Sequence, residues 1–217
     1  MDTLSKPIYE RRNSKLGPAL VKALEDRHFE AAYFDDIPHA VEKVFSLIPK
    51  DHVVSWGGSM TAGAMDLYEE TVRRGYKVIN RDAAQSPEER VNLMRQALLS
   101  DTFLMGTNAL SEDGQLVNID GNGNRIAALC YGPRQVIIVT GINKAVKTLD
   151  DAIARARNQA APLNVQRFES IKTPCNSSGV CANCKNSDSI CSHIVITRLC
   201  KPAGRIKVII IGQELGF

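Results

Sequence analysis

The 217-residue sequence lacks the features that mark several broad classes of protein. Its first residues contain no apolar stretch of the kind found in secretory signals, and its longest apolar runs have the length of a strand, whereas a membrane-spanning helix needs ~20 apolar residues. No aromatic residue lies between positions 169 and 216, although basic residues are frequent there. We therefore expect a cytoplasmic protein that is not bound to a membrane, and the missing stacking platforms argue against nucleic-acid binding.

Two enzyme signatures are also missing. The chain has no Gly-x-Ser-x-Gly nucleophile elbow. A Gly-x-Gly pair at Gly121 and Gly123 lacks the third glycine of a dinucleotide fingerprint, because Ile126 stands in its place. The acidic residue that such a site needs ~20 positions later is absent too, since Asn143 and Lys144 lie there. We therefore expect no classical NAD site.

What the chain does contain is an alternation of helix-like and strand-like segments. With 44% hydrophobic and 24% charged residues it has a globular composition, and its length suits a single domain over residues 1–217 with N-terminal helices within 1–50. Apolar spacing predicts helices over 14–29, 38–48 and 61–74, a helix that Ser86 and Glu89 open as a capping box, and one from Thr148 to about Ala160. Strands are predicted over 52–55, 76–80, 102–106, 135–140, 194–199 and 207–211, with a hairpin turn at 112–114.

This alternation predicts an α/β fold with a mainly parallel sheet flanked by helices. We expect the last strand to rejoin the main sheet, which makes residues 172–193 a Cys-rich loop insertion near the C-terminus. In folds of this kind ligands bind beyond the carboxyl ends of the strands. The turns that follow the strands are therefore the places where function is expected.

Four such turns carry candidate ligand-binding residues. The first combines glycines with hydroxyl groups before a helix, a setting that binds anions, and the third presents a guanidinium suited to a carboxylate or phosphate. The alternatives are ordinary tight turns, an Arg125–Asp120 ion pair, and a solvated Lys144. The candidates are Gly57, Gly58, Ser59 and Thr61; Gly106, Thr107 and Asn108; Asn118, Asp120, Gly121, Asn124 and Arg125; and Lys144.

The cysteines are concentrated in the predicted loop. Cys175, Cys181, Cys184 and Cys191 form a candidate metal-ligand set, because Cys-x-x-Cys lets two thiolates bind one metal from a single turn. Zinc and an iron–sulfur cluster both suit four thiolates, and the spacing does not decide between them. Free thiols, disulfides formed on oxidation and a redox pair are the alternatives. The remaining cysteines, Cys130 and Cys200, are predicted to be packing residues, and His193 is a substitute ligand.

Residues 106–125, 136–144 and 57–61 together resemble the LUD-domain family of lactate-utilisation proteins, the LutC/YkgG group. The resemblance covers most of the chain. It implies a fold like that of the NagB/RpiA/CoA-transferase group and a link to the metabolism of lactate or a related small acid. From the polar turns we expect a small anionic metabolite as ligand, and electron-transfer proteins and, in a homo-oligomer, a second copy of the chain are candidate partners.

Three hypotheses follow. The leading one is a LUD-domain protein that binds a small anion in a crevice at the strand ends, with zinc or an iron–sulfur cluster in the cysteine loop. The second is an isomerase or an acyl- or CoA-transferase, with Glu112, Asp113 or Asp120 as base or nucleophile. The third is a non-catalytic binding or regulatory protein whose metal loop is structural. The sequence leaves open whether the protein is an enzyme.

Overall fold

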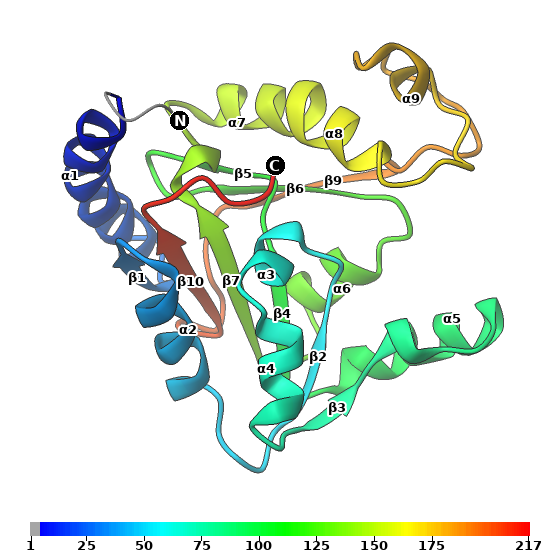
Figure 1. Cartoon of the computed structure of the whole chain (residues 1–217), viewed down its shortest axis with the longest axis horizontal. Helices are drawn as coiled ribbons and strands as arrows, with labels where there is room; N and C mark the ends of the chain where they lie inside the picture. Colours follow the sequence, from blue (N-terminus) through cyan, green and yellow to red (C-terminus); the bar gives the residue numbers. More distant parts are fainter. Residues whose placement is uncertain (1–4) are drawn as a thin grey trace.

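The computed structural model describes residues 5–217, so the first four residues of the predicted domain lie outside it. Over the described residues the chain forms a six-stranded parallel sheet in the order β1-β10-β7-β4-β2-β3 (Figure 1). The predicted α/β class with a mainly parallel sheet is confirmed. The strands are β1 (Glu30–Phe34), β2 (Val53–Trp56), β3 (Lys77–Ile79), β4 (Thr102–Gly106), β7 (Gln135–Gly141) and β10 (Ile206–Ile211).

The core lies on both faces of this sheet. Along β7 and β10 alternate side chains enter opposite clusters, so that Ile138 packs on one face and Ile137 on the other. The helices α1 (Lys6–Glu25) and α6 (Asn124–Cys130) cover the first face. The second face is covered by α2 (Ile37–Ser46), α3 (Met60–Ala64) and α4 (Leu67–Arg73). Helices therefore exclude water from both faces of the sheet, which explains the near-continuous apolar runs of the central strands.

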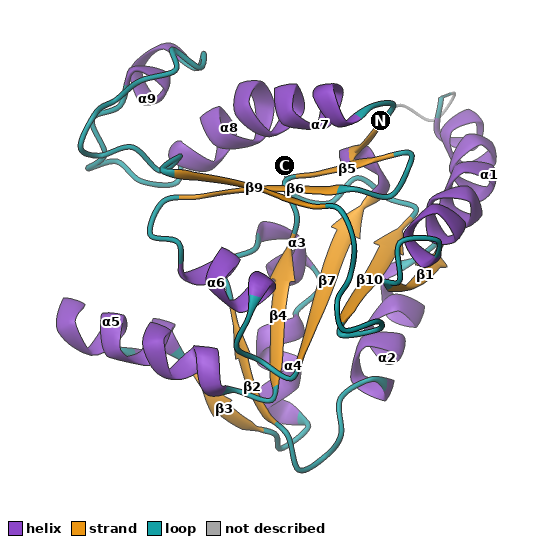
Figure 2. Ribbon diagram, turned by 180° about the vertical axis from the view of Figure 1, so that it is seen from behind, coloured by secondary structure: helices purple, strands orange, loops and turns teal. Residues whose placement is uncertain are grey.

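A second sheet crosses one end of the first (Figure 2). It contains β5 (Ala109–Ser111), β6 (Leu116–Asp120), β8 (Ala145–Val146) and β9 (His193–Thr197), in the order β8-β5-β6-β9. The predicted hairpin turn at 112–114 joins β5 to β6, which pair antiparallel. β9 corresponds to the predicted strand 194–199 and pairs with β6 rather than with the main sheet. This sheet packs on α7 (Leu149–Arg155) through a small apolar cluster.

Several predicted elements have different limits in the structure. The helix predicted over 14–29 is α1, which begins eight residues earlier and ends before β1, a strand that the sequence analysis missed. Its expected last turn therefore holds His28 in a left-handed turn, with φ of 66°, instead of on a helix surface. The helix predicted over 61–74 is two helices, because Asp66 adopts a φ of 52° between them.

The helix predicted to begin at Ser86 is α5 (Pro87–Gln96). Ser86 caps it by accepting a hydrogen bond from the Glu89 N–H, but the Glu89 carboxylate accepts from the Gln85 N–H, so the capping box is only half formed. None of the α5 residues is buried, so its predicted apolar face does not reach the core. The helix from Thr148 starts with a complete capping box and continues beyond Ala160 into α8 (Ala161–Val165).

The C-terminal strand β10 lies between β1 and β7, which confirms that the end of the chain rejoins the main sheet. Before it, α9 (Pro174–Ser178) and a series of turns carry the cysteine-rich segment, residues 172–193. Cys200 is buried as predicted, whereas Cys130 is exposed at the end of α6, so the prediction of a buried Cys130 is wrong. Among the described residues no helix combines the length and the hydropathy that crossing a bilayer requires.

Candidate functional site

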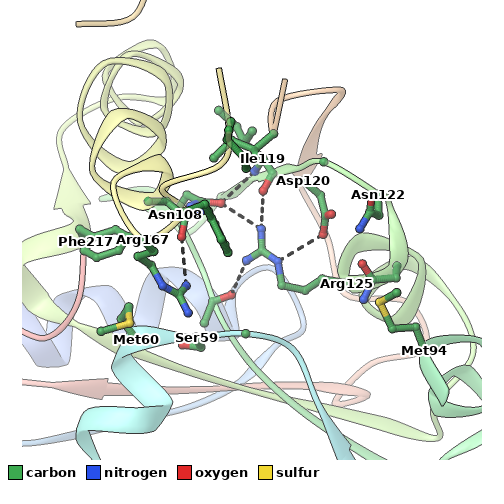
Figure 3. A pocket seen from close by; sticks show the side chains of 18 of the residues that line it. Ser59, Met60, Met94, Asn108, Ile119, Asp120, Asn122, Arg125, Arg167 and Phe217 are labelled. Atoms are coloured by element: carbon green, nitrogen blue, oxygen red, sulfur yellow. Dashed lines mark hydrogen bonds and ion pairs between the residues drawn. The ribbon is translucent and has the colours of Figure 1, made fainter. Parts of the chain in front are cut away.

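A pocket of about 840 Å³ opens where four strands of the main sheet end (Figure 3). The turns after β2, β3, β4 and β7 contribute Ser59, Arg81, Asn108 and Lys144 respectively, and the loop between β6 and α6 closes one side. The opposite wall comes from residues 164–171 and 187–190. The pocket therefore lies where the parallel topology predicts ligand binding.

The turn after β2 is held by an aromatic pair. Tyr68 stacks on Trp56, with ring centroids 5.0 Å apart. Its hydroxyl donates to the carbonyl of Gly57 and accepts from the N–H of Ser59. Burial raises the pKa of Tyr68 to about 12, so the phenol keeps its proton and this pair of hydrogen bonds persists across the physiological pH range. The aromatic pair thus fixes the backbone that the sequence analysis selected for its glycines.

Arg125 joins the turns after β4 and β6. Every N–H of its guanidinium has a protein acceptor: Nε contacts Asp120, and the two terminal nitrogens contact the carbonyls of Gly106 and Ile119 and the side chains of Asn108 and Asn118. Figure 3 shows the guanidinium beside Asn108, Ile119 and Asp120. The ion pair with Asp120 spans 3.4 Å, and both partners are largely buried. Arg125 therefore lines the pocket but is already fully engaged by the protein.

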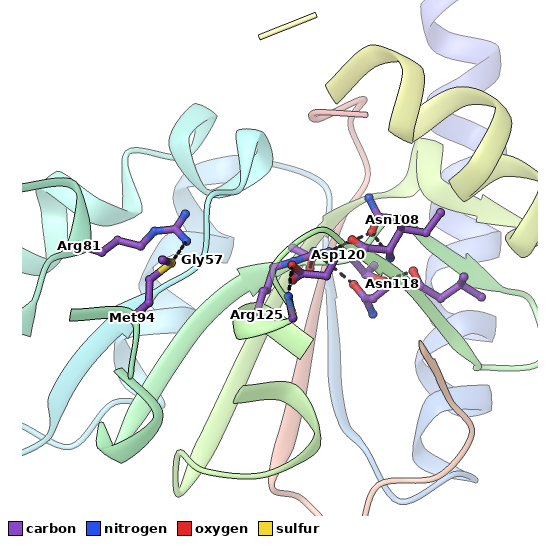
Figure 4. Close-up of polar contacts among 12 residues, drawn as sticks. Gly57, Arg81, Met94, Asn108, Asn118, Asp120 and Arg125 are labelled. Atoms are coloured by element: carbon purple, nitrogen blue, oxygen red, sulfur yellow. Dashed lines mark hydrogen bonds and ion pairs between the residues drawn. The ribbon is translucent and has the colours of Figure 1, made fainter. Parts of the chain in front are cut away.

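Arg81 is engaged far less completely. Its side chain is 14% exposed, and within the described chain its Nε–H has no hydrogen-bond partner. The nearest carboxylate oxygen, Oδ1 of Asp82, lies 3.8 Å from Nε, and Nη1 reaches the sulfur of Met94 at 3.8 Å (Figure 4). A β-carbon on Gly58 would lie 2.7 Å from Nη2, so the guanidinium lies directly against this glycine. Burial lowers the pKa of the Arg81 guanidinium.

Lys144 ends the short turn after β7 and is only 3% exposed. Its Nζ donates to Oγ1 of Thr61 at 2.9 Å and to the carbonyl of Thr107 at 3.3 Å. No carboxylate oxygen of the described residues lies within ion-pair distance of Nζ, and the nearby charges of Arg155 and Arg125 are positive. Burial, followed by these two charges, lowers the pKa of Lys144 to about 7. The predicted solvated alternative for Lys144 does not hold.

The carboxylates of the pocket are committed to other partners. Asp120 pairs with Arg125, and Asp82 pairs with Arg90 at 2.9 Å. Asp188 accepts from a backbone N–H of the cysteine-rich segment. Arg81 and Lys144 thus supply positive charge that the pocket's own acidic groups do not balance at hydrogen-bond distance, and such a surface attracts anions.

The structure brings most of the predicted ligand-binding residues together. Gly57, Thr61 and Asn118 lie behind the pocket surface, where they contact Arg125 or Lys144. Glu112 and Asp113 lie on the β5–β6 hairpin, paired with Lys147 and Arg27, and do not line the pocket. Those that line it are Gly58, Ser59, Gly106, Thr107, Asn108, Asp120, Gly121, Asn124, Arg125 and Lys144.

Sequence reasoning missed Arg81 and Arg167. Arg81 directly follows the predicted strand 76–80, so the rule that selected the other turns also applied to it. Arg167 comes from the segment after α8 and rests on Phe168, with its guanidinium 5.5 Å from the ring centroid. No sequence pattern indicated it, because its position depends on how α8 crosses the second sheet.

The four candidate metal ligands are free thiols of intermediate exposure. Burial raises the pKa of Cys191 to about 11, and the charges of Cys175, Cys181 and Cys184 add to this effect, so the four lie within electrostatic range of one another. Among residues 5–217 no three metal-binding side chains are arranged to hold an ion. Next to Cys191, Ile190 lies against Gly121, whose added β-carbon would meet the Ile190 Cα at 3.2 Å. The cysteine-rich segment therefore forms part of the pocket wall.

Similar structures exist among solved proteins. A DUF162 family protein from Deinococcus radiodurans matches with a TM-score of 0.52 and 14% identity, over 92% of this chain and 98% of that one. This similarity shows a shared fold. Shorter matches are eIF2B beta from Chaetomium thermophilum (TM-score 0.37, 17% identity, 53% of this chain and 44% of that one) and ribose 5-phosphate isomerase from Plasmodium falciparum (0.33, 14%, 51% and 52%). No curated protein matches this chain.

The family comparison covers nearly the whole fold. The model of the LUD domain matches residues 18–211, from the middle of α1 to the end of β10. That span includes every strand of the main sheet and each turn that contributes to the pocket. The chain described here therefore belongs to the LUD-domain family.

Proposed function

We propose that this protein binds a small organic anion, a carboxylate or a phosphate ester, in the pocket at the strand ends, and that it serves the metabolism of lactate or a related small acid. One observation supports this above all: Arg81 lines the pocket as a largely buried cation with no carboxylate at hydrogen-bond distance, and the buried Lys144 amine of the same pocket contacts only uncharged oxygens. The Asp82 carboxylate lies 3.8 Å from Arg81 Nε and compensates this buried charge only in part, so an anion that accepts from the free Nε–H lowers the free energy of the site.

The different hydrogen bonding of Arg125 and Arg81 supports the same proposal. Arg125 holds the turns in place with all of its donors, whereas Arg81 keeps an unused Nε–H beside Gly58. A guanidinium with free donors suits the paired oxygens of a carboxylate or phosphate. We therefore propose that Arg81 shares the ligand binding predicted for Arg125, and that Arg125 is a positioning residue.

An isomerase or an acyl- or CoA-transferase is the alternative from the enzyme class. Of its three candidate carboxylates only Asp120 lines the pocket, and it is paired with Arg125 at 3.4 Å. A non-catalytic binding or regulatory protein would use the same pocket without turnover. Ligand binding without any product would favour this last hypothesis.

Calorimetric titration with lactate, pyruvate and inorganic phosphate tests the proposal. We expect at least one of these anions to bind, and Arg81→Gln to weaken that binding by roughly 10- to 100-fold, the usual contribution of a charge-assisted hydrogen bond. Arg134→Gln is the matched control, because this arginine pairs with Asp101 at the surface and its side chain is 80% exposed. Equal binding by both variants would place the anion elsewhere.

We also propose that Cys175, Cys181, Cys184 and Cys191 bind zinc or an iron–sulfur cluster, which the mutual influence of these four thiols supports. An iron–sulfur cluster would accept or donate electrons, and electron-transfer proteins would then be partners. Elemental analysis and a visible spectrum of anaerobically purified protein distinguish the metals, since zinc is colourless. Cys181→Ser is expected to lose the metal and Cys130→Ser, the exposed control, to keep it. Unmetallated wild-type protein would contradict this part.

A further inference from the structure

Lys144 has the surroundings of a neutral amine rather than of an ammonium ion. A neutral amine has two N–H groups, and the described residues supply two acceptors, Oγ1 of Thr61 and the carbonyl of Thr107. The Thr61 hydroxyl donates its own proton to the carbonyl of Leu215, so its oxygen can only accept from Nζ. This leaves the lone pair of a neutral Nζ without a hydrogen-bond donor.

The charges around Lys144 favour the same protonation state. Arg155 and Arg125 are the charged groups that act on Nζ, and both are positive. Asp120, a carboxylate that lines the same pocket, is paired with Arg125 at 3.4 Å. A pKa of about 7 means that roughly half of the lysines are uncharged at neutral pH, whereas an ordinary lysine with a pKa of ~10.4 is almost fully charged. Lysines next to other cations in buried sites act as nucleophiles toward carbonyl groups.

We propose that Lys144 is a nucleophile that forms an imine with an anionic ligand carrying a ketone or aldehyde group, a 2-oxo acid being the simplest example. This inference rests on the proposed function, because it assigns the ligand's carbonyl to the same pocket. Nζ of the neutral amine attacks the carbonyl carbon, so that a C–N bond forms as the C=O π bond breaks, and one Nζ proton passes to the carbonyl oxygen to give a carbinolamine. The hydroxyl group then leaves with the second Nζ proton as water, which gives the C=N bond with no change in oxidation state.

A neighbouring lysine provides a matched comparison. Lys147 lies three residues further along the chain, is exposed, and forms an ion pair with Glu112 that raises its pKa. At neutral pH its amine is almost entirely protonated and therefore unreactive. Two lysines only three residues apart thus differ in the reactivity that we expect of their amines.

Borohydride trapping tests the inference. The whole protein is incubated at pH 7 with pyruvate and cyanoborohydride, and the modified residue is found by peptide mass mapping. We expect one reduced pyruvate adduct, on Lys144, which Lys144→Arg abolishes and Lys147→Arg leaves intact. Lactate, which has no carbonyl group, should give none. If pyruvate binds by calorimetry but Lys144 carries no adduct, the imine is refuted while the anion pocket stands.

A smaller probe removes the dependence on pyruvate. Formaldehyde with cyanoborohydride methylates neutral amines, and at pH 7 we expect Lys144 to react at least roughly tenfold faster than Lys147, given their different neutral fractions. Equal or slower methylation of Lys144 would overturn the inference. Loss of anion binding in Arg81→Gln together with normal methylation of Lys144 would show that the two proposals are separable.

Discussion

The pocket edge and the cysteine-rich segment hold their shapes in different ways. At the pocket edge, the largely buried Arg125 joins the turns after β4 and β6, and an aromatic pair fixes the turn after β2. In the cysteine-rich segment, residues 172–193, Thr173 is by contrast the one buried residue, and local side-chain-to-backbone hydrogen bonds hold the segment, such as that from the Lys172 N–H to Asp188. The pocket edge is therefore built in advance, whereas the wall formed by residues 187–190 depends on weak local contacts.

The largest expected effect comes from removing the arginine of the pocket edge. Arg125→Ala leaves the largely buried Asp120 carboxylate without its ion-pair partner and removes donors from two backbone carbonyls, so we expect a loss of about 3–5 kcal/mol in the free energy of unfolding. Urea denaturation measures it. Arg134→Ala, a surface pair, should lose no more than about 1 kcal/mol. Similar losses in both variants would show that the arginine network does not hold this edge.

The second prediction concerns the charge state of Lys144. Its pKa is lower in the folded protein than in the unfolded chain, so the unfolded state binds more protons between pH 7 and about 10.4. This lysine therefore destabilises the fold most below pH 7, and the penalty declines as the pH rises through that window. Lys144→Met should raise the Tm relative to the wild type at pH 6, by an amount on the order of 2 kcal/mol in stability, and less at pH 10. A difference in Tm that does not change with pH would contradict the lowered pKa.

A third prediction separates affinity from stability at the pocket edge. Gly58→Ala brings a β-carbon within 2.7 Å of the Arg81 guanidinium, and the flexible end of that side chain must move. We expect anion affinity to fall about tenfold, equivalent to ~1.4 kcal/mol, with little change in the Tm. Gly63→Ala is the control, because Gly63 also lines the pocket but its β-carbon would meet nothing within 4 Å and leaves Arg81 in place. Binding would be measured by calorimetry, and unchanged affinity in Gly58→Ala would remove Arg81 from the site.

The smallest effect is expected from the cysteine-rich segment. In metal-free protein, Cys181→Ser and Cys184→Ser should change the free energy of unfolding by no more than about 0.5 kcal/mol, because both side chains lie near the surface with few partners. Hydrogen exchange should show fast exchange over residues 179–190 and slow exchange in β7 and β10. Metal loading should slow exchange in the segment alone. Slowing throughout the main sheet would show that the two regions are coupled more strongly than their contacts indicate.

The sequence was informative where local chemistry and periodicity coincide. The apolar runs of β4, β7 and β10 predicted strands that are buried on both faces. The polar turns that follow β2, β4 and β7 indicated the edge of the sheet where the pocket lies. It was less informative where the same residue types serve two purposes. In β1 apolar and polar residues hardly alternate, because all five residues are half-buried. Cys130 lies in an apolar stretch of the sequence, and this stretch did not indicate that its end of α6 faces solvent.

By itself, the sequence determined the fold class, the placement of the C-terminal strand in the main sheet, and most of the residues of the candidate site. These follow from periodicity and from turn chemistry, which act over a few residues. Only the tertiary structure decided that every N–H of the Arg125 guanidinium has a protein acceptor, that the Arg81 Nε–H has none, and that Lys144 is buried near two arginines. The physical reason is that burial and pairing depend on groups brought together from distant parts of the chain: Lys144 bonds to Thr61, which lies 83 residues away.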